Sequence, residues 1–138
     1  MDRPEHVRAV LFDTGGTDIG GLLFELRSHG IACALVSSMP SHALLHELGR
    51  SRMLARFDAV IGTDMITRHK PDPEGCLLAA RLLDVDPASC VVIAAADAGI
   101  AAARAAGMYV CARDDGSGTL DLSHADETFS SYAELMFR

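Results

Sequence analysis

Asp13 is the first residue in this chain whose position favours chemistry. It comes directly after an apolar run, residues 7–12, that is too short for a helix and rich in strand-forming residues. A buried parallel strand delivers the residue that follows it to the carboxyl edge of its sheet, where open α/β folds bind their ligands. A carboxylate at that edge can act as a nucleophile or as a general acid or base. Asp13 is therefore the central candidate.

Other polar residues follow similar boundaries. Ser37 and Ser38 come directly after a second apolar run, residues 31–36, and Lys70 ends a loop before a proline. The two glycines after Asp13 leave backbone N–H groups that could form an anion-binding nest. From the residues alone, Asp13 is a candidate for chemistry, and Gly15 and Gly16 are candidates for binding an anion.

Each candidate also has a purely structural interpretation. Asp13 could cap the turn that follows it, and Lys70 could form an ion pair with Asp13 that stabilises an empty pocket. Ser37 and Ser38 could satisfy backbone groups at the end of their strand. The glycines could be needed only for the turn conformation. The residues alone leave both interpretations open.

Histidine and cysteine do not suggest a metal cluster. His42 and His46 have the i, i+4 spacing that can hold a metal, but no third ligand is near in sequence, and we interpret them as a solvated helix face. The four cysteines form no C-x-x-C pair, and we expect them to act as small core residues; they are Cys33, Cys76, Cys90 and Cys111.

Strand-like and helix-like segments alternate along the whole chain. We expect Ser41 to cap a helix that ends before Gly49, and Asp97 to cap the helix that begins at Ala98. This alternation predicts an α/β fold, a three-layer α/β/α sandwich with a mostly parallel, Rossmann-like sheet of five to six strands. The predicted strands are 7–12, 31–36, 57–62, 90–94 and 108–112, with helices after 20, 41, 73 and 98 and a short strand and helix in 128–137.

The sequence resembles the haloacid dehalogenase (HAD) superfamily of phosphatases and related hydrolases. The first motif of that family ends a strand with Asp-x-Asp-Gly-Thr, and residues 13–17 here read Asp-Thr-Gly-Gly-Thr. The resemblance implies that Asp13 holds the nucleophile position, Ser37 the hydroxyl that contacts a phosphoryl oxygen, and Lys70 the lysine of the third motif. The candidate residues are then Asp13 and Lys70 as catalytic groups, and Thr14, Gly15, Gly16, Ser37 and Ser38 as ligand-binding groups. Residues 85–108 match the region of the fourth motif, so the similarity extends to about Arg113.

The chain also departs from the family pattern. Gly15 replaces the second aspartate of the first motif, and residues 94–96 are alanines where related phosphatases carry the acidic ligands of Mg²⁺. Only about twenty residues separate Thr17 from Ser37, which leaves no room for the helical cap of many relatives. Mg²⁺ usually needs one or two carboxylates among its oxygen ligands. The resemblance therefore implies a capless, degenerate member without a metal site, and we expect no cofactor.

Three functions remain open from this sequence. The first is a repurposed protein that performs metal-independent acid/base catalysis on, or binds, a small molecule at Asp13 and Lys70. The second is a residual phosphatase-like hydrolase that uses Asp13 as its nucleophile. The third is a non-catalytic binding or scaffold protein whose exposed pocket mouth is covered by a partner, such as a second copy in a homodimer.

Composition sets the remaining expectations. A chain of 138 residues with 49% hydrophobic content predicts one domain over residues 1–138. The net charge of −7 argues against nucleic acid or an anionic membrane surface as a partner. No apolar stretch approaches the roughly 20 residues of a membrane span, and the polar first residues do not resemble a signal peptide. We therefore expect a cytoplasmic protein with a small-molecule ligand.

Overall fold

The structure is a computed structural model that describes residues 1–13 and 19–135. Its α-helices are α1 (Gly20–Ser28), α2 (Ser41–Ser51), α3 (Glu74–Leu83) and α4 (Asp97–Ala105). Its strands are β1 (Ala9–Phe12), β2 (Ala32–Val36), β3 (Ala59–Ile61), β4 (Cys90–Ala94), β5 (Tyr109–Arg113) and β6 (Glu127–Phe129). Short 3₁₀ turns lie at Leu54–Arg56, Thr63–Met65, Pro87–Ser89, Leu122–His124 and Tyr132–Glu134.

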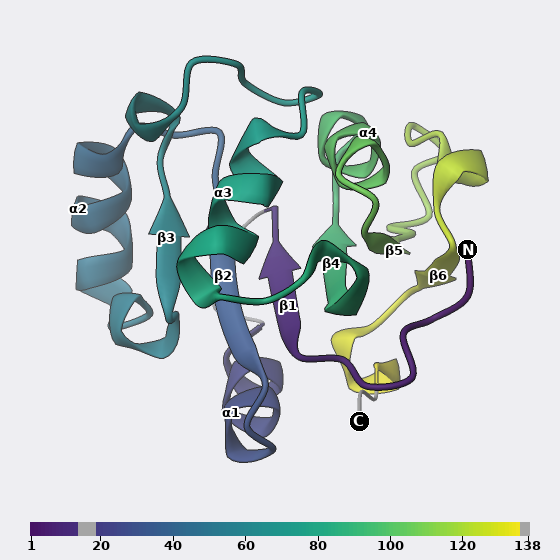
Figure 1. Cartoon of the computed structure of the whole chain (residues 1–138), viewed down its shortest axis with the longest axis horizontal. Coiled ribbons are helices and arrows are strands. Elements are labelled where there is room, and N and C mark those ends of the chain that lie inside the picture. The colour runs from purple at the N-terminus through teal and green to yellow at the C-terminus, as the bar shows by residue number, and fades with distance from the viewer. Residues whose placement is uncertain (14–18, 136–138) are drawn as a thin grey trace.

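The strands form one six-stranded sheet in the order β3-β2-β1-β4-β5-β6, and every neighbouring pair is parallel (Figure 1). The chain first builds outward from β1 to β3 and then returns across the sheet through α3 to place β4 on the other side of β1. The order therefore reverses between β1 and β4, and open α/β sheets place their ligands at such a point. The predicted α/β sheet is confirmed, with six strands.

Helices cover both faces of this sheet. Alternate residues of β1 point to opposite faces. Phe12 belongs to the hydrophobic cluster that also contains Leu23 of α1 and Leu44 of α2. Leu11 belongs to the cluster on the other face, together with Ala79 of α3 and Ile100 of α4. The central strands are therefore buried on both sides, as the apolar run before Asp13 predicts, and the three-layer sandwich is confirmed.

Two helix starts differ from the sequence prediction. Ser41 and Asp97 are the first residues of α2 and α4 instead of their N-caps, and neither caps its own helix. The backbone N–H and the Oγ of Ser41 instead donate to Oδ1 of Asp64, at 2.7 and 2.8 Å. An acidic side chain from a distant turn thus accepts a backbone N–H at the start of α2. The helix α2 also continues through Gly49, where the sequence predicted its end.

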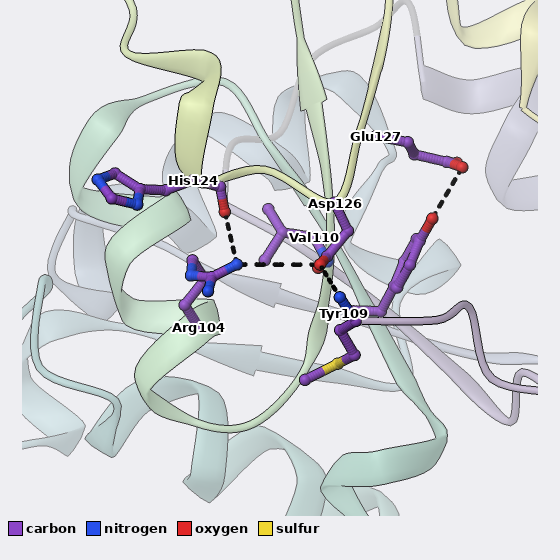
Figure 2. A network of polar contacts seen from close by, with 7 residues as sticks. Arg104, Tyr109, Val110, His124, Asp126 and Glu127 are labelled. Atoms are coloured by element: carbon purple, nitrogen blue, oxygen red, sulfur yellow. Dashed lines mark hydrogen bonds and ion pairs between the residues drawn. The ribbon is translucent and has the colours of Figure 1, made fainter.

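Polar contacts hold the edge strand β6 against β5 and α4 (Figure 2). The Asp126 side chain is only 2% exposed, and its Oδ2 accepts the N–H of Val110 at 2.8 Å. Arg104 of α4 donates to the carbonyl of His124 at 3.0 Å, and its guanidinium lies 3.8 Å from Asp126. The Tyr109 hydroxyl donates to Glu127 at 3.0 Å. These contacts fix a strand of only three residues in the sheet.

The described helices are all too short, or too polar, to cross a lipid bilayer.

Candidate functional site

The candidate site lies where β1 and β4 end side by side. Asp13 directly follows β1 and donates its backbone N–H to the carbonyl of Ile93 in β4, at 3.2 Å. Ala95 and Ala96 directly follow β4 and lead into α4. The Asp13 side chain therefore lies beside the segment after β4, which resembles the fourth motif of the family.

The Asp13 carboxylate is held by two backbone amides. The Ala95 N–H lies 3.0 Å from both carboxylate oxygens, and the Ala96 N–H donates to Oδ2 at 3.2 Å. These donors precede the first turn of α4, where the helix dipole also favours a negative charge. The backbone thus supplies the polar partners that a carboxylate needs when only 9% of its residue is exposed.

Burial dominates the electrostatics of Asp13. Loss of hydration raises its pKa above the ordinary value of 3.8, because it disfavours the charged form. The amide of Ala95, the positive charge of Lys70 and the amide of Ala96 act in the opposite direction, in that order, and do not cancel the effect. Asp13 therefore binds a proton more tightly than an exposed aspartate does, which favours a role in proton transfer.

Lys70 brings a positive charge to the same edge. Its Nζ donates to the carbonyl of Val36 at 2.8 Å and to the backbone carbonyl of Asp13 at 3.3 Å. Burial lowers the pKa of the ammonium group, while the charge of Asp13 and then that of Cys76 oppose the shift. Among the described contacts, Lys70 reaches Asp13 through its carbonyl. The lysine thus connects the ends of β1 and β2 and still faces the pocket.

Ser37 and Ser38 follow β2 as predicted, but they differ in exposure. Ser37 is 9% exposed and its Oγ accepts the N–H of Met39 at 3.0 Å, whereas Ser38 is exposed. A hydroxyl that accepts one hydrogen bond still has its own proton to donate. Ser37 can therefore satisfy the backbone and contact a ligand at once, so its structural and functional interpretations are compatible.

These groups line one pocket of about 390 Å³. The structure brings together Asp13, Lys70, Ser37 and Ser38; the other three predicted site residues, Thr14, Gly15 and Gly16, lie outside the described residues. The remaining lining residues come from β2 and the turn after it, from α2, from the segment between β4 and α4, and from the start of α4. They are Leu35, Met39, Leu44, Glu47, Leu48, Ala95, Ala96, Ala98 and Gly99.

The contribution of α2 was missed by the sequence analysis. Leu44, Glu47 and Leu48 line the pocket from one face of this helix, and Glu47 adds a second carboxylate to its wall. Their i, i+3 and i+4 spacing shows that they share a helix face. Nothing in the sequence showed that this face lies beside Asp13, because that depends on the packing of α2 against the sheet.

The family resemblance raises the question of a Mg²⁺ site. The oxygen atoms that the described residues offer beside Asp13 do not fit this metal. Mg²⁺ prefers octahedral oxygen ligands that usually include one or two carboxylates. Both oxygens of the Asp13 carboxylate accept backbone N–H groups, and residues 94–96 offer no side-chain oxygen. Within residues 1–13 and 19–135, no group of three or more His, Cys, Asp or Glu side chains is arranged to hold a metal. Independence from metal remains a prediction.

Known proteins resemble this chain in sequence and in structure. It is 38% identical over 91 residues to beta-phosphoglucomutase of Bacillus subtilis, covering 66% of this chain and 39% of that protein. It is 32% identical over 138 residues to hexitol phosphatase A of Escherichia coli, covering 96% of this chain and 62% of that protein. The crystal structure of CbbY from Rhodobacter sphaeroides in complex with phosphate superposes with a TM-score of 0.76 at 26% identity, over 86% of this chain and 55% of that one.

The chain spans less than two thirds of the length of each of these relatives. A family model described as haloacid dehalogenase-like hydrolase matches residues 16–113, a range that covers β2 to β5 and all four α-helices. The predicted resemblance is thus confirmed, and this chain belongs to the haloacid dehalogenase-like hydrolase family.

Proposed function

We propose that this chain binds a small anionic molecule in the pocket of Asp13 and Lys70 without Mg²⁺, and that Asp13 serves there as a general acid or base. One observation carries the proposal. The Asp13 carboxylate accepts hydrogen bonds from the Ala95 and Ala96 amides, at the place where a metal-dependent site would present further acidic ligands. Because these amides hold the carboxylate, the Lys70 ammonium group and the Ser37 hydroxyl remain to bind an anionic ligand.

The ammonium group of Lys70 provides the main electrostatic interaction with the ligand. An ammonium group has three donors, and the structure uses two of them on the carbonyls of Val36 and Asp13. The third donor and the positive charge serve a ligand anion, and the Ser37 hydroxyl offers a further donor. Leu44 and Leu48 supply an apolar wall for the carbon skeleton of the ligand.

Asp13 supplies the acid/base chemistry. Its raised pKa brings its proton affinity closer to neutral pH, and proton transfer is most effective when the pKa lies near the working pH. Only one carboxylate is required for such a step. The reaction class that this supports is proton transfer on the bound carbon skeleton, as in a lyase or an isomerase.

Phosphorylated sugars are the first ligands to test. The relatives named above are a phosphoglucomutase and a hexitol phosphatase by name, and CbbY was crystallised with phosphate. A pocket of about 390 Å³ lies within the usual size range of small-molecule sites. The family relationship also supports a second function, a residual hydrolase in which Asp13 attacks the phosphorus atom. A scaffold protein covered by a second copy is the non-catalytic alternative.

Binding is measured first, by calorimetric titration of inorganic phosphate and fructose 1-phosphate in the presence of a chelator. Wild type is compared with Lys70→Met and with Arg68→Met, which removes a positive charge from the same loop but outside the pocket. Loss of a charge-assisted hydrogen bond of about 1.5–3 kcal/mol weakens binding by about tenfold or more in Lys70→Met. Arg68→Met is expected to bind as wild type does.

Phosphate release from a panel of phosphoesters separates the three functions. It is assayed with Mg²⁺ and then with chelator, for wild type and for Asp13→Asn. Release that needs both Mg²⁺ and Asp13 would overturn the proposal in favour of a residual hydrolase. Chelator-resistant binding without release supports the proposal. Absence of binding together with self-association that Asp13→Asn leaves unchanged would favour the scaffold.

A further inference from the structure

Gly99 lies in the first turn of α4, directly against the side chain of Asp13. A Cβ atom built at position 99 would stand 2.2 Å from Oδ2 of Asp13 and 3.0 Å from its Cβ and Cγ. In real proteins a Cβ atom essentially never comes within 3.0 Å of a non-bonded heavy atom. The Asp13 carboxylate therefore occupies the space that any other residue at position 99 would fill.

A glycine at this helical position is costly by itself. Glycine in a helix is about 0.5–1 kcal/mol less favourable than alanine, and alanine is the commonest residue of α4. Gly49 in α2 is different, because a Cβ there would meet nothing within 4 Å. The close approach to Asp13 thus gives position 99 a specific need for glycine that position 49 lacks.

We propose that Gly99 is the positioning residue for Asp13. The space beside it lets the carboxylate reach the amides of Ala95 and Ala96, and those amides hold it in place without a metal ion. Gly99 also lines the pocket, but the role proposed for it is to leave space for Asp13. The inference concerns the position of Asp13 and stands whether or not the ligand of the proposed function is found, so the two can fail separately.

The positioning is tested by the pH dependence of two amide signals. In ¹H–¹⁵N spectra of the wild type, the Ala95 and Ala96 amides are expected to shift together with one apparent pKa as Asp13 titrates. Asp13→Asn abolishes this shift. Gly99→Ala is expected to abolish or strongly reduce it because the carboxylate is displaced, whereas Gly49→Ala leaves it as in the wild type. A merely structural role of Gly99 would not change this titration.

A double-mutant cycle covers the case in which Gly99→Ala folds poorly. In the wild-type background this substitution is expected to lower the denaturant midpoint, because the new methyl group collides with Asp13. In the Asp13→Gly background the collision is absent, and the same substitution is expected to raise the midpoint, as alanine usually does in a helix. Gly49→Ala should raise it in both backgrounds.

The change of sign distinguishes the proposal from its alternatives. A loss of stability in both backgrounds would place the conflict elsewhere and overturn the inference. Amide titration curves that survive Gly99→Ala would do the same, because they would show that Asp13 reaches the amides without this space.

Discussion

The stability of the Asp13→Asn variant relative to the wild type is expected to increase as the pH rises. The two side chains have nearly the same shape, but only aspartate can ionise. Burial raises the pKa of Asp13 in the folded chain above its ordinary value of 3.8, so the folded state binds the proton more tightly than the unfolded state. Ionisation of Asp13 therefore costs folding free energy, and the asparagine variant avoids that cost.

The sign and the pH window follow from proton linkage. Well below pH 3.8, Asp13 is protonated in both states and the stability difference between the two proteins is constant. Between 3.8 and the raised folded pKa, the wild type loses up to about 1.4 kcal/mol of stability per pH unit relative to the variant. Above the folded pKa the difference becomes constant again, and its total height is about 1.4 kcal/mol for each unit of pKa shift.

Urea unfolding of both proteins from pH 2.5 to 8 measures this difference directly. All other ionisable groups are shared, so their contributions largely cancel in the comparison. Constant differences between asparagine and aspartic acid, such as an altered hydrogen bond to Ala95, move the whole curve up or down but change neither its shape nor its total rise. A difference that does not vary with pH, or that moves against the variant as the pH rises, would refute the argument. The second result would mean that the amides and Lys70 outweigh the burial of the charge.

Two further predictions concern Lys70 and Asp126. Lys70 is the only lysine in the chain, so ¹³C-lysine labelling gives a single ε-carbon signal. We expect this signal to report a pKa below 10.5, because burial disfavours the ammonium group. The pKa should be lower still in Asp13→Asn, because that variant lacks the negative charge that opposes the downward shift. An unshifted or raised value would contradict the burial of the ammonium group. Asp126→Ala should lower the free energy of unfolding by about 1–3 kcal/mol, because it leaves the buried N–H of Val110 without its acceptor (Figure 2). Asp126→Asn, which keeps an acceptor oxygen, should cost less in the same denaturant titration, and an equal loss would assign the effect to charge.

The fold could be predicted from the sequence because its signals are local. The apolar runs that form β1 and β2 are short and bounded by polar or glycine residues, and the run before Asp13 is buried on both faces as predicted. The helix starts were less predictable. Ser41 and Asp97 have the residue types of N-caps, but Asp64 binds Ser41, and Asp97 accepts the N–H of Asp121 at 2.9 Å. Both side chains thus form hydrogen bonds with residues more than twenty positions away instead of capping their own helices.

The candidate site was predictable in part for the same reason. Asp13, Ser37 and Lys70 could be identified because they follow recognisable boundaries and match a family pattern. The hydrogen-bond partners of Asp13 could not be predicted, because they are the backbone amides of two alanines, and alanine has no polar side chain. Gly99 could not be identified either, since its importance depends on a contact between residues 86 positions apart.

Residues 94–96 are alanines, yet this segment binds the Asp13 carboxylate through the backbone amides of Ala95 and Ala96. A carboxylate ligand is lost when its residue type changes, whereas backbone N–H groups at the end of a parallel strand are positioned by the sheet itself. Because β1 and β4 are neighbours, the amides after β4 face Asp13 whatever side chains they carry. A change of side chain at this edge therefore leaves the backbone donors in place. The carboxylate of Asp13 occupies those donors, and Lys70 supplies the positive charge beside it.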